Sequence, residues 1–387
     1  MKQKQDTLIV TLGRDPHANF GVVNPPVYRA STILHPTVEA LRGRKQPYTY
    51  GRRGTPTTVA LQQTIAGLEG GHNTMLTPSG LSAVTTALLS LLRTGDHLLM
   101  TDSVYGPTRH FCDTILRRNG IETEYYDPLI GAGIERLMKA NTAVVFTESP
   151  GSITFEVQDI PAIARVAHAR GAKLVIDNTW ASPLYFKPFE HGADVSIQAI
   201  TKYLCGHSDA MMGAITTNEE TWKSALSGHG ALGQMAAPDD AYLVLRGIRT
   251  LSVRLERHMK TGLTLARWLA ARPEVARVLH PALENDPGHA IWKRDFTGAS
   301  GLFGVVLKPC SDAALAAMLD HLELFGMGWS WGGFESLIVP QDLTGIRTVT
   351  PPKFEGPLLR IHAGLEDPDD LIADLDAGFA RLNAAGN

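Results

Sequence analysis

The segment ITKYLCGHSDAMMG, residues 200–213, combines one lysine with glycines and several polar side chains. Lys202 follows an apolar, β-rich run, and Gly206 and Gly213 allow the backbone to approach a ligand closely. A lysine held in a pocket loses its proton more easily than one in water, because desolvation disfavours the ammonium. A neutral amine is what Schiff-base chemistry requires. Lys202 is therefore a candidate nucleophile, and the alternative interpretation is a solvated surface charge.

A carboxylate stands at the end of another apolar run, KLVID, whose last residue is Asp177. Asp177 could simply cap a turn after a strand. It could also form an ion pair with a protonated ring nitrogen, which pyridoxal phosphate needs because its pyridinium is the electron sink for a carbanion. One strand–loop–strand interval separates Asp177 from Lys202. Both side chains could therefore face the same ring.

A phosphate site is suggested by TPSGLSAV, in which Ser79 and Gly80 stand where a buried helix is expected to begin. The free N–H groups and the dipole of a helix N-terminus bind phosphate. Alternatively, Ser79 is only an N-cap. Thr201, next to the lysine, could give a hydroxyl to the same phosphate.

Two tyrosines and an arginine could complete such a site. Tyr105, in DSVYGPT, could stack on a pyridine ring or be a packed aromatic residue. Tyr50 and Arg52, in YTYGRRGTPT, follow an irregular stretch. A guanidinium suits a phosphate, and an arginine on an arm could reach a neighbouring subunit. The alternative interpretation of this stretch is a solvated loop.

A further arginine interrupts the apolar strand pattern LLRIHAG. Arg360 has little reason to be there unless it is paired, either with a substrate carboxylate or in a structural salt bridge. Ser330 and Trp331 precede a glycine pair and could line a pocket, although Trp331 could equally pack in the core.

The elements that must position these residues alternate between strand and helix up to about residue 220. Such alternation predicts a mostly parallel sheet with helices on both faces, an α/β fold. Ligands bind at the carboxyl ends of the strands in these folds, where Tyr105, Asp177 and Lys202 are expected. The expected strands are 97–101, 121–127, 142–149, 173–177 and 193–200, and the expected helices are 55–71, 79–95, 107–120 and 159–171.

The pattern changes after about residue 245, where a long amphipathic helix, further strands and a closing helix predict a smaller α+β domain. In the closing helix, Asp367 is expected to cap and Pro368 to occupy the first turn. The predicted organisation is an arm at 1–55 that packs on a neighbouring subunit, a large cofactor-binding domain at 56–245 and a C-terminal domain at 246–387.

Composition narrows the class of protein. The chain has 387 residues, 44% of them hydrophobic, and a formal net charge of -3 without a basic block, so no nucleic-acid footprint is expected. No signal peptide or membrane span is expected either. Three scattered cysteines fit free thiols in a reducing cytoplasm, with Cys205 as a small packed residue beside the lysine. No Cys or His spacing suggests a metal site.

Taken together, these motifs resemble one family. The stretch from KLVIDNTW to SDAMMG is similar to the signature of the Cys/Met-metabolism PLP-dependent enzymes, and the resemblance runs from YGRRGTPT to the closing helix. Within that family, ESPGSITFEVQDIPAIA, SWGGFESLI and LRIHAGLEDPDDLIADLDAGFARL resemble the bacterial cystathionine β-lyase branch. The resemblance implies the type I, aspartate-aminotransferase-like fold, pyridoxal 5'-phosphate as cofactor, and a homotetramer built as a dimer of dimers.

The resemblance also implies a role for each candidate residue. It assigns Lys202 to covalent attachment of the cofactor and to movement of the α-proton. It implies that Asp177 pairs with the pyridine nitrogen and that Tyr105 stacks on the ring. The phosphate is expected to bind to the backbone of Gly80 and Leu81 and to the Thr201 hydroxyl, with Tyr50 and Arg52 of the adjacent subunit completing the site. Arg360, with Ser330 and beside Trp331, is expected to bind the substrate α-carboxylate.

The implied reaction is β-elimination of L-cystathionine to homocysteine, pyruvate and ammonia, the transsulfuration step of methionine biosynthesis. An acid must protonate the leaving thiolate, and Lys202 is the first candidate, with Tyr50 or Tyr105 as helpers. The alternatives are a broad cysteine-S-conjugate or cystine β-lyase and a cystathionine γ-lyase or γ-synthase. Ala199 and Ser152 stand where the γ-acting branches usually have Ser and Asn. A non-catalytic relative is disfavoured, because Lys202, Asp177 and Arg360 are all present.

Overall fold

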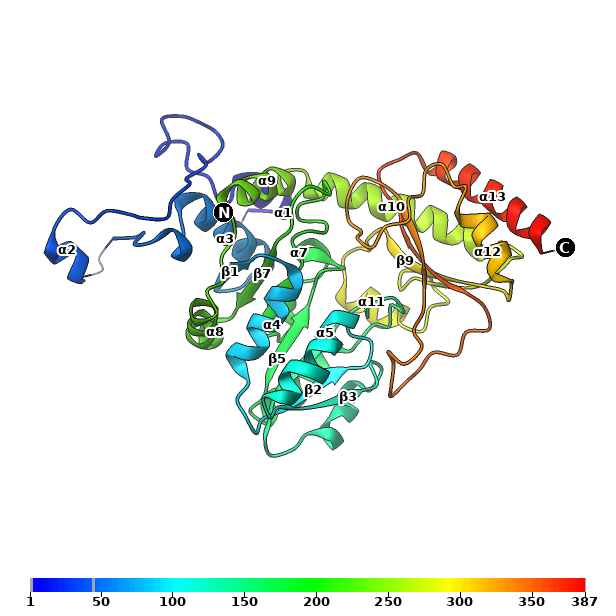
Figure 1. Ribbon diagram of the computed structural model, residues 1–387, viewed down its shortest axis with the longest axis horizontal. Helices are drawn as coiled ribbons and strands as arrows, with labels where there is room; N and C mark the ends of the chain where they lie inside the picture. Colours follow the sequence, from blue (N-terminus) through cyan, green and yellow to red (C-terminus); the bar gives the residue numbers. More distant parts are fainter. Residues whose placement is uncertain (1–2, 44–45, 387) are drawn as a thin grey trace.

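The computed structural model describes residues 3–43 and 46–386. Figure 1 shows an elongated molecule with two sheet-containing parts and an N-terminal segment that extends away from them. Helix α2 (Val38–Gly43) lies far out on this extended segment, and α13 (Pro368–Ala385) lies at the opposite end of the molecule. The expected arm at 1–55 stays a prediction, and part of that range, helix α1 (Gln5–Thr11), packs on its own chain with Ile9 buried.

The larger part is built on a seven-stranded sheet in the order β1-β7-β6-β5-β4-β2-β3. Neighbouring strands from β3 to β6 pair in parallel, whereas β7 runs antiparallel to both of its neighbours. The predicted mostly parallel sheet is therefore confirmed, and β1 and β7 are additions to the predicted strands. The strands are β1 (Asn73–Thr77), β2 (His97–Thr101), β3 (Glu122–Tyr126), β4 (Thr142–Glu148), β5 (Lys173–Asp177), β6 (Val195–Gln198) and β7 (Gly213–Thr217).

Helices cover both faces of this sheet because successive strand residues point to opposite sides. Leu98 and Met100 face a core shared with α4 (Gly80–Leu91), α5 (Gly106–Phe111) and α8 (Glu219–Ala231). Leu99 faces the other core, which includes side chains of α6 (Ile160–Ala169). Helix α3 (Pro56–Glu69) packs on β1 and β7 from the same chain.

Local signals explain where the helices begin and end. Thr55 caps α3 through a hydrogen bond from the N–H of Thr58, and Gly70 ends the helix at φ 78°, a left-handed conformation suited to glycine. Helix α4 ends at Leu91, four residues before the predicted end at 95. The reason is a separate turn in which the Asp96 carboxylate accepts the backbone N–H of Arg93. The predicted helix 107–120 begins as α5 and continues as a π-helical turn at Cys112–Leu116.

The smaller part contains an antiparallel sheet in the order β10-β11-β9-β8. Its strands are β8 (Val275–Leu279), β9 (Leu302–Leu307), β10 (Leu337–Gln341) and β11 (Leu358–His362). Helices α10 (Leu251–Ala270), α12 (Asp312–Leu319) and α13 share one core with these strands. Asp367 caps α13 and Pro368 occupies its first turn, as predicted. One apolar stripe of α13 is buried: Leu371, Leu375, Phe379 and Leu382.

The connection between the two sheets is helical. Its main elements are α9 (Pro238–Ile248) and α10, so the predicted domain boundary at 245/246 falls inside α9. The domain boundaries stay a prediction. The other short elements are α1 (Gln5–Thr11), α7 (Ser182–Tyr185), α11 (His289–Asp295) and the 3-10 turns at Gly51–Arg53, Gly131–Leu137 and Pro188–His191.

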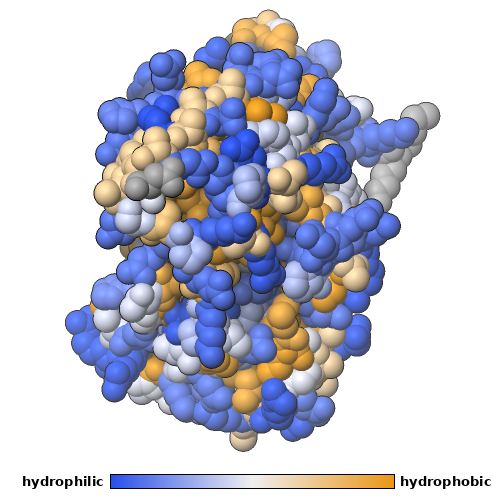
Figure 2. All heavy atoms as spheres, turned by 90° about the vertical axis from the view of Figure 1, so that its right-hand side faces the viewer, coloured by the Kyte–Doolittle hydropathy of each residue, from blue (hydrophilic) through white to orange (hydrophobic). Residues whose placement is uncertain are grey.

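The surface and the cysteines fit a globular protein of this kind. Figure 2 shows the face at the C-terminal end, where hydrophilic residues cover much of the surface and hydrophobic residues lie in separate patches. Among the described residues, no helix has the length and apolar character needed to cross a bilayer. The three cysteines are free, and burial together with Asp209 raises the pKa of Cys205 to about 11, so its thiol stays protonated beside the lysine segment.

Candidate active site

A cavity of about 460 Å³ lies at the carboxyl ends of β4 and β5 and extends to the smaller domain. It brings together nine of the predicted site residues, from segments more than 270 residues apart in sequence. These residues are Gly80, Leu81, Tyr105, Asp177, Thr201, Lys202, Ser330, Trp331 and Arg360. Tyr50 and Arg52 do not line this cavity.

Lys202 lies in a tight turn, four residues after the end of β6. Its amine donates a hydrogen bond to Ser330 Oγ over 2.8 Å and lies 5.3 Å from the centre of the Trp331 ring. Burial lowers the pKa of Lys202 to about 8, the positive charge of Arg360 acts in the same direction, and the charge of Asp177 opposes both. The lysine is therefore a partly buried amine that loses its proton far more easily than a surface lysine.

The smaller domain reaches the backbone of this lysine through a glycine. Gly332 has φ 89°, and a Cβ atom at this position would lie 2.9 Å from the carbonyl carbon of Lys202. A side chain is excluded by both the conformation and the close approach. This contact explains how Ser330 and Trp331, which precede the glycine, are held against the amine.

Asp177 is the last residue of β5, and its carboxylate faces the cavity. Its Oδ1 accepts hydrogen bonds from the backbone N–H and the hydroxyl of Thr179, over 3.0 and 2.5 Å. The same hydroxyl accepts the N–H of Ala199, so the ends of β5 and β6 are linked. Burial raises the pKa of Asp177, and the hydrogen bonds from Thr179 and the charge of Lys202 act against that rise. A cation beside this carboxylate would be strongly favoured.

The N-terminus of α4 points its first backbone N–H groups toward the same cavity, through Gly80 and Leu81. Ser79 caps the helix by accepting the N–H of Ser82 over 3.1 Å. A Cβ atom at Gly80 would lie only 2.5 Å from the Cβ of Ala199, so the helix start packs directly on the segment before Lys202. The Thr201 hydroxyl accepts the N–H of Met212 over 3.0 Å.

Tyr105 precedes α5, and its ring is 46% exposed at the cavity. Its backbone N–H donates to Glu148 Oε2 over 2.8 Å. Burial and the charges of Glu148 and Asp177 raise the pKa of the Tyr105 phenol. The phenol therefore stays protonated at neutral pH, and the residue is exposed enough to contact a ligand in the cavity.

Arg360, in the middle of β11, lies on the opposite side of the cavity. Among the described residues, no carboxylate forms a salt bridge with Arg360. Its guanidinium instead donates to the backbone carbonyls of Trp329 and Ser330, both over 3.2 Å, and to that of Gly328 over 3.4 Å. A half-buried guanidinium whose observed partners are all backbone carbonyls is suited to receive a carboxylate.

Tyr50 and Arg52 lie elsewhere in the chain. Arg52 lines a second cavity of about 320 Å³ and donates to the carbonyl of Gly230 over 3.2 Å, while Tyr50 is 46% exposed. Within one chain, these residues do not reach the Lys202 cavity. Their expected contribution to the site of an adjacent subunit stays a prediction.

Sequence reasoning missed several residues that line the cavity. Glu148, the last residue of β4, is one of them, and its position at a strand end was the signal that could have identified it. Thr179, which holds Asp177, follows the same strand end. Met211 and the 77% exposed Trp329 line the cavity without a sequence signal of this kind.

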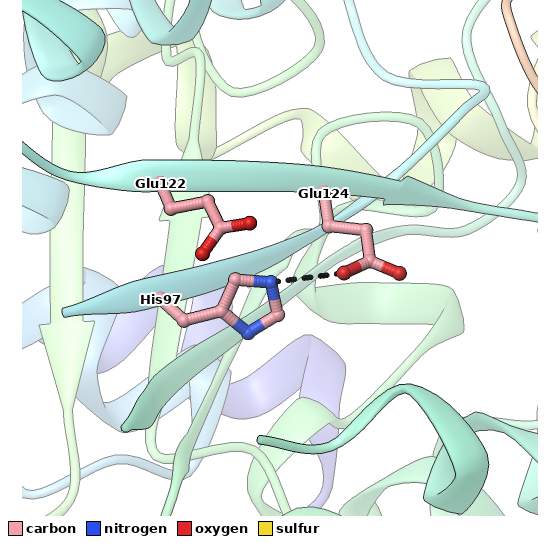
Figure 3. A group of neighbouring side chains, drawn as sticks. All are labelled: His97, Glu122 and Glu124. Carbon is pink, nitrogen blue, oxygen red and sulfur yellow. Dashed lines mark ion pairs between the residues drawn. The ribbon is translucent and has the colours of Figure 1, made fainter. Parts of the chain in front are cut away.

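A separate group of ligand-type side chains lies at the other end of the sheet. His97 begins β2, and Glu122 and Glu124 point toward it from β3 (Figure 3), with ligand atoms within 4.8 Å of one another. The amine of Lys139 lies 2.8 Å from Glu122 and 2.7 Å from Glu124. Because this ammonium contacts both carboxylates and His97 lies 3.3 Å from Glu124, we interpret the group as an ion-paired cluster.

The residues around the cavity fit pyridoxal phosphate. The half-buried Asp177 lacks a cationic side chain within ion-pair distance in the described chain and would pair with a pyridinium. The start of α4, where Gly80 leaves no room for a side chain, is suited to a phosphate. Lys202 has the lowered pKa that covalent attachment through its amine requires.

Comparison with known proteins agrees with this fit. The family model of the Cys/Met metabolism PLP-dependent enzymes matches residues 6–380. The cystathionine beta-lyase MetC of Escherichia coli is 48% identical, over 98% of this chain and 99% of that protein. An L-alanine/L-glutamate racemase of Wolbachia pipientis wMel is 40% identical, over 98% of each chain. Cystathionine gamma synthase from Xanthomonas oryzae pv. oryzae, solved in complex with cystathionine, has a TM-score of 0.92 and 30% identity, with 100% of both chains covered. This chain therefore belongs to the Cys/Met metabolism PLP-dependent enzymes, and its cofactor is pyridoxal phosphate.

Proposed function

We propose that this protein catalyses β-elimination of L-cystathionine to homocysteine, pyruvate and ammonia, and so supplies homocysteine for methionine biosynthesis. The observation that carries the proposal is the convergence of Lys202, Asp177 and Arg360 on one cavity. The 48% identity to a cystathionine beta-lyase over nearly the whole chain supports this member of the family over its γ-acting relatives.

In this proposal the cofactor stabilises negative charge at the substrate Cα, because its ring is an electron sink. Asp177 keeps the ring nitrogen protonated, and Tyr105 holds the ring from one face. Gly80, Leu81 and Thr201 fix the phosphate at the start of α4. These residues position the reacting carbon and leave the chemistry of proton movement to Lys202.

Lys202 removes the Cα proton as a free amine. Its pKa of about 8 keeps an appreciable neutral fraction at neutral pH, which a general base requires. Arg360 binds the substrate carboxylate, and Ser330, which is 2.8 Å from the lysine amine, helps to orient that amine.

The leaving thiolate needs a proton when the Cβ–S bond breaks, and Lys202 now carries one. Tyr105 of the same chain and Tyr50 of an adjacent subunit are the other candidates for proton donor in this step.

The products of L-cystathionine distinguish the proposed reaction from its rivals. We expect pyruvate, ammonia and one free thiol in equal amounts, measured by a coupled dehydrogenase assay and a thiol reagent. 2-Oxobutyrate with cysteine would assign the protein to γ-cleavage instead. If alanine and glutamate are racemised and cystathionine stays intact, the β-lyase proposal is wrong. Parallel reactions with cystine and other cysteine conjugates would show whether the enzyme is a broad β-lyase.

Arg360→Lys tests the carboxylate site. Lysine keeps the charge but loses the planar pair of donors. We expect KM for cystathionine to rise about 10- to 100-fold, the range for loss of a charge-assisted hydrogen bond, with a smaller change in kcat. The visible absorbance of the bound cofactor should stay unchanged. The matched control is Arg277→Lys, an exposed arginine of the same domain. An unchanged KM would show that another group binds the carboxylate.

The quaternary arrangement belongs to the same proposal. The extended segment that carries α2 and the placement of Tyr50 and Arg52 outside the cavity support an arm that completes the phosphate site of a neighbour. A homotetramer in the cytoplasm is the form expected from the family resemblance. Mass measurement of the holoenzyme in solution would distinguish monomer, dimer and tetramer.

A further inference from the structure

Glu148 lies in the cavity, although no step of the proposed reaction uses it. It ends β4 in direct register with Asp177 at the end of β5, so two carboxyl groups stand side by side at the cavity. One oxygen of Glu148 accepts the backbone N–H of Tyr105 over 2.8 Å. Glu148 therefore ties Tyr105, the residue proposed to hold one face of the ring, to the end of β4, which lies beside Asp177.

The two carboxyl groups differ in their support. Asp177 accepts two hydrogen bonds from Thr179, whereas Glu148 accepts one, from Tyr105. The other charged or titratable side chains that line the cavity are Tyr105, Lys202 and Arg360. Two neighbouring carboxyl groups that are shielded from water do not both ionise readily. Burial, and then the charge of Asp177, raise the pKa of Glu148 well above its ordinary value.

We propose that Glu148 is a positioning residue that acts in its neutral form. Its carboxyl group fixes the backbone of Tyr105, and its neutrality leaves Asp177 as the one carboxylate that charges the ring nitrogen of the cofactor. This inference rests on the proposed cofactor roles of Asp177 and Tyr105, and it does not depend on which amino acid is the substrate.

The test compares Glu148→Gln with Glu148→Ala in the holoenzyme. Glutamine is neutral and keeps an oxygen acceptor, so we expect kcat and the affinity for pyridoxal phosphate to stay within about threefold of wild type. Alanine leaves the N–H of Tyr105 without this acceptor and frees the loop that holds the ring, and we expect about a 10- to 100-fold loss in kcat, in cofactor affinity or in both. Cofactor affinity is measured by titrating the cofactor-free protein with pyridoxal phosphate.

A spectroscopic readout tests the neutral form directly. A charged Glu148 would stabilise positive charge nearby and so raise the pH at which the visible band of the bound cofactor, near ~420 nm, titrates. If Glu148 is neutral, Glu148→Gln leaves that midpoint unchanged. A midpoint that falls by a unit or more in Glu148→Gln would overturn the proposal.

Two further outcomes would also overturn it. One is an equal loss of cofactor affinity in Glu148→Gln and Glu148→Ala, and the other is wild-type behaviour of Glu148→Ala. If Glu148→Ala fails to fold, the Glu148→Gln measurements still decide the matter. The matched controls are Glu135→Gln and Glu135→Ala on the surface. Because cofactor affinity and the band need no substrate, they remain decisive even if cystathionine is not cleaved.

Discussion

Replacement of Lys202 by alanine is expected to abolish formation of pyruvate from cystathionine, with a loss of at least about 10³-fold in kcat. The change would remove the two functions that we propose for this lysine, covalent attachment of the cofactor and removal of the Cα proton. No other lysine lines the cavity in the described part of the chain, so none can take over. Loss of covalent attachment should also alter the visible band of the bound cofactor, which provides a readout independent of turnover.

The measurement is steady-state pyruvate formation with an absorbance spectrum of each variant. Lys173→Ala is a suitable control, because Lys173 is a partly exposed lysine on β5 that lies outside the cavity. It should keep both the band and the activity. Pyruvate formation by Lys202→Ala at more than a few per cent of the wild-type rate would refute the role given to this lysine.

Of the substitutions named here, Asp102→Ala is expected to lower the free energy of unfolding most, by about 3–5 kcal/mol. This is the range for breaking a buried ion pair. Asp102 is fully buried after the end of β2 and lies between two arginines. Its carboxylate accepts from Arg109 over 2.6 Å and from Arg347 over 3.1 Å. It also accepts three backbone N–H groups, from residues 348 to 350. Alanine would leave both guanidiniums buried without this partner.

This network also predicts a dependence on pH. Burial alone would raise the pKa of Asp102, but the backbone and arginine hydrogen bonds outweigh it and hold the pKa below its ordinary value. The stabilisation is therefore complete above the unfolded pKa of about 3.9 and is lost as the pH falls below it. Urea unfolding at pH 7 and at lower pH would measure both effects.

The control for this prediction is Asp320→Ala, an exposed aspartate after α12, which should change the free energy of unfolding by no more than about 0.5 kcal/mol. The difference between wild type and Asp102→Ala should shrink as the pH falls toward 3. A difference that stays constant over this range would mean that the carboxylate charge does not contribute.

Sequence patterns predicted the elements whose signals are local. The run KLVID has the same bounds as β5, and Asp367, Pro368 and the apolar stripe define α13. Strand β1 was missed because NTMLT is short and partly polar, and its partner β7 lies about 140 residues later. Long-range pairing of this kind leaves no periodic signal at either strand.

The candidate site shows the same division. Lys202, Asp177 and Arg360 were predicted because each is a charged residue at the end of, or within, an apolar run, where an unpaired charge is unusual. Glu148 has the same kind of position and was missed because no partner for it was visible in the sequence. The Asp102 network depends on Arg347, from a loop about 245 residues away, and only the tertiary fold brings them together.

The charge of the Arg360 guanidinium affects how strong a base Lys202 is. In the free protein its positive charge lowers the proton affinity of Lys202. A substrate whose carboxylate binds to Arg360, as we propose, would offset that charge, so we expect the amine to be a stronger base when such a substrate is bound. An amine that lacks a carboxylate would meet a weaker base in the same pocket. If Arg360 binds the substrate carboxylate as proposed, we expect the cavity to select substrates by reactivity as well as by affinity.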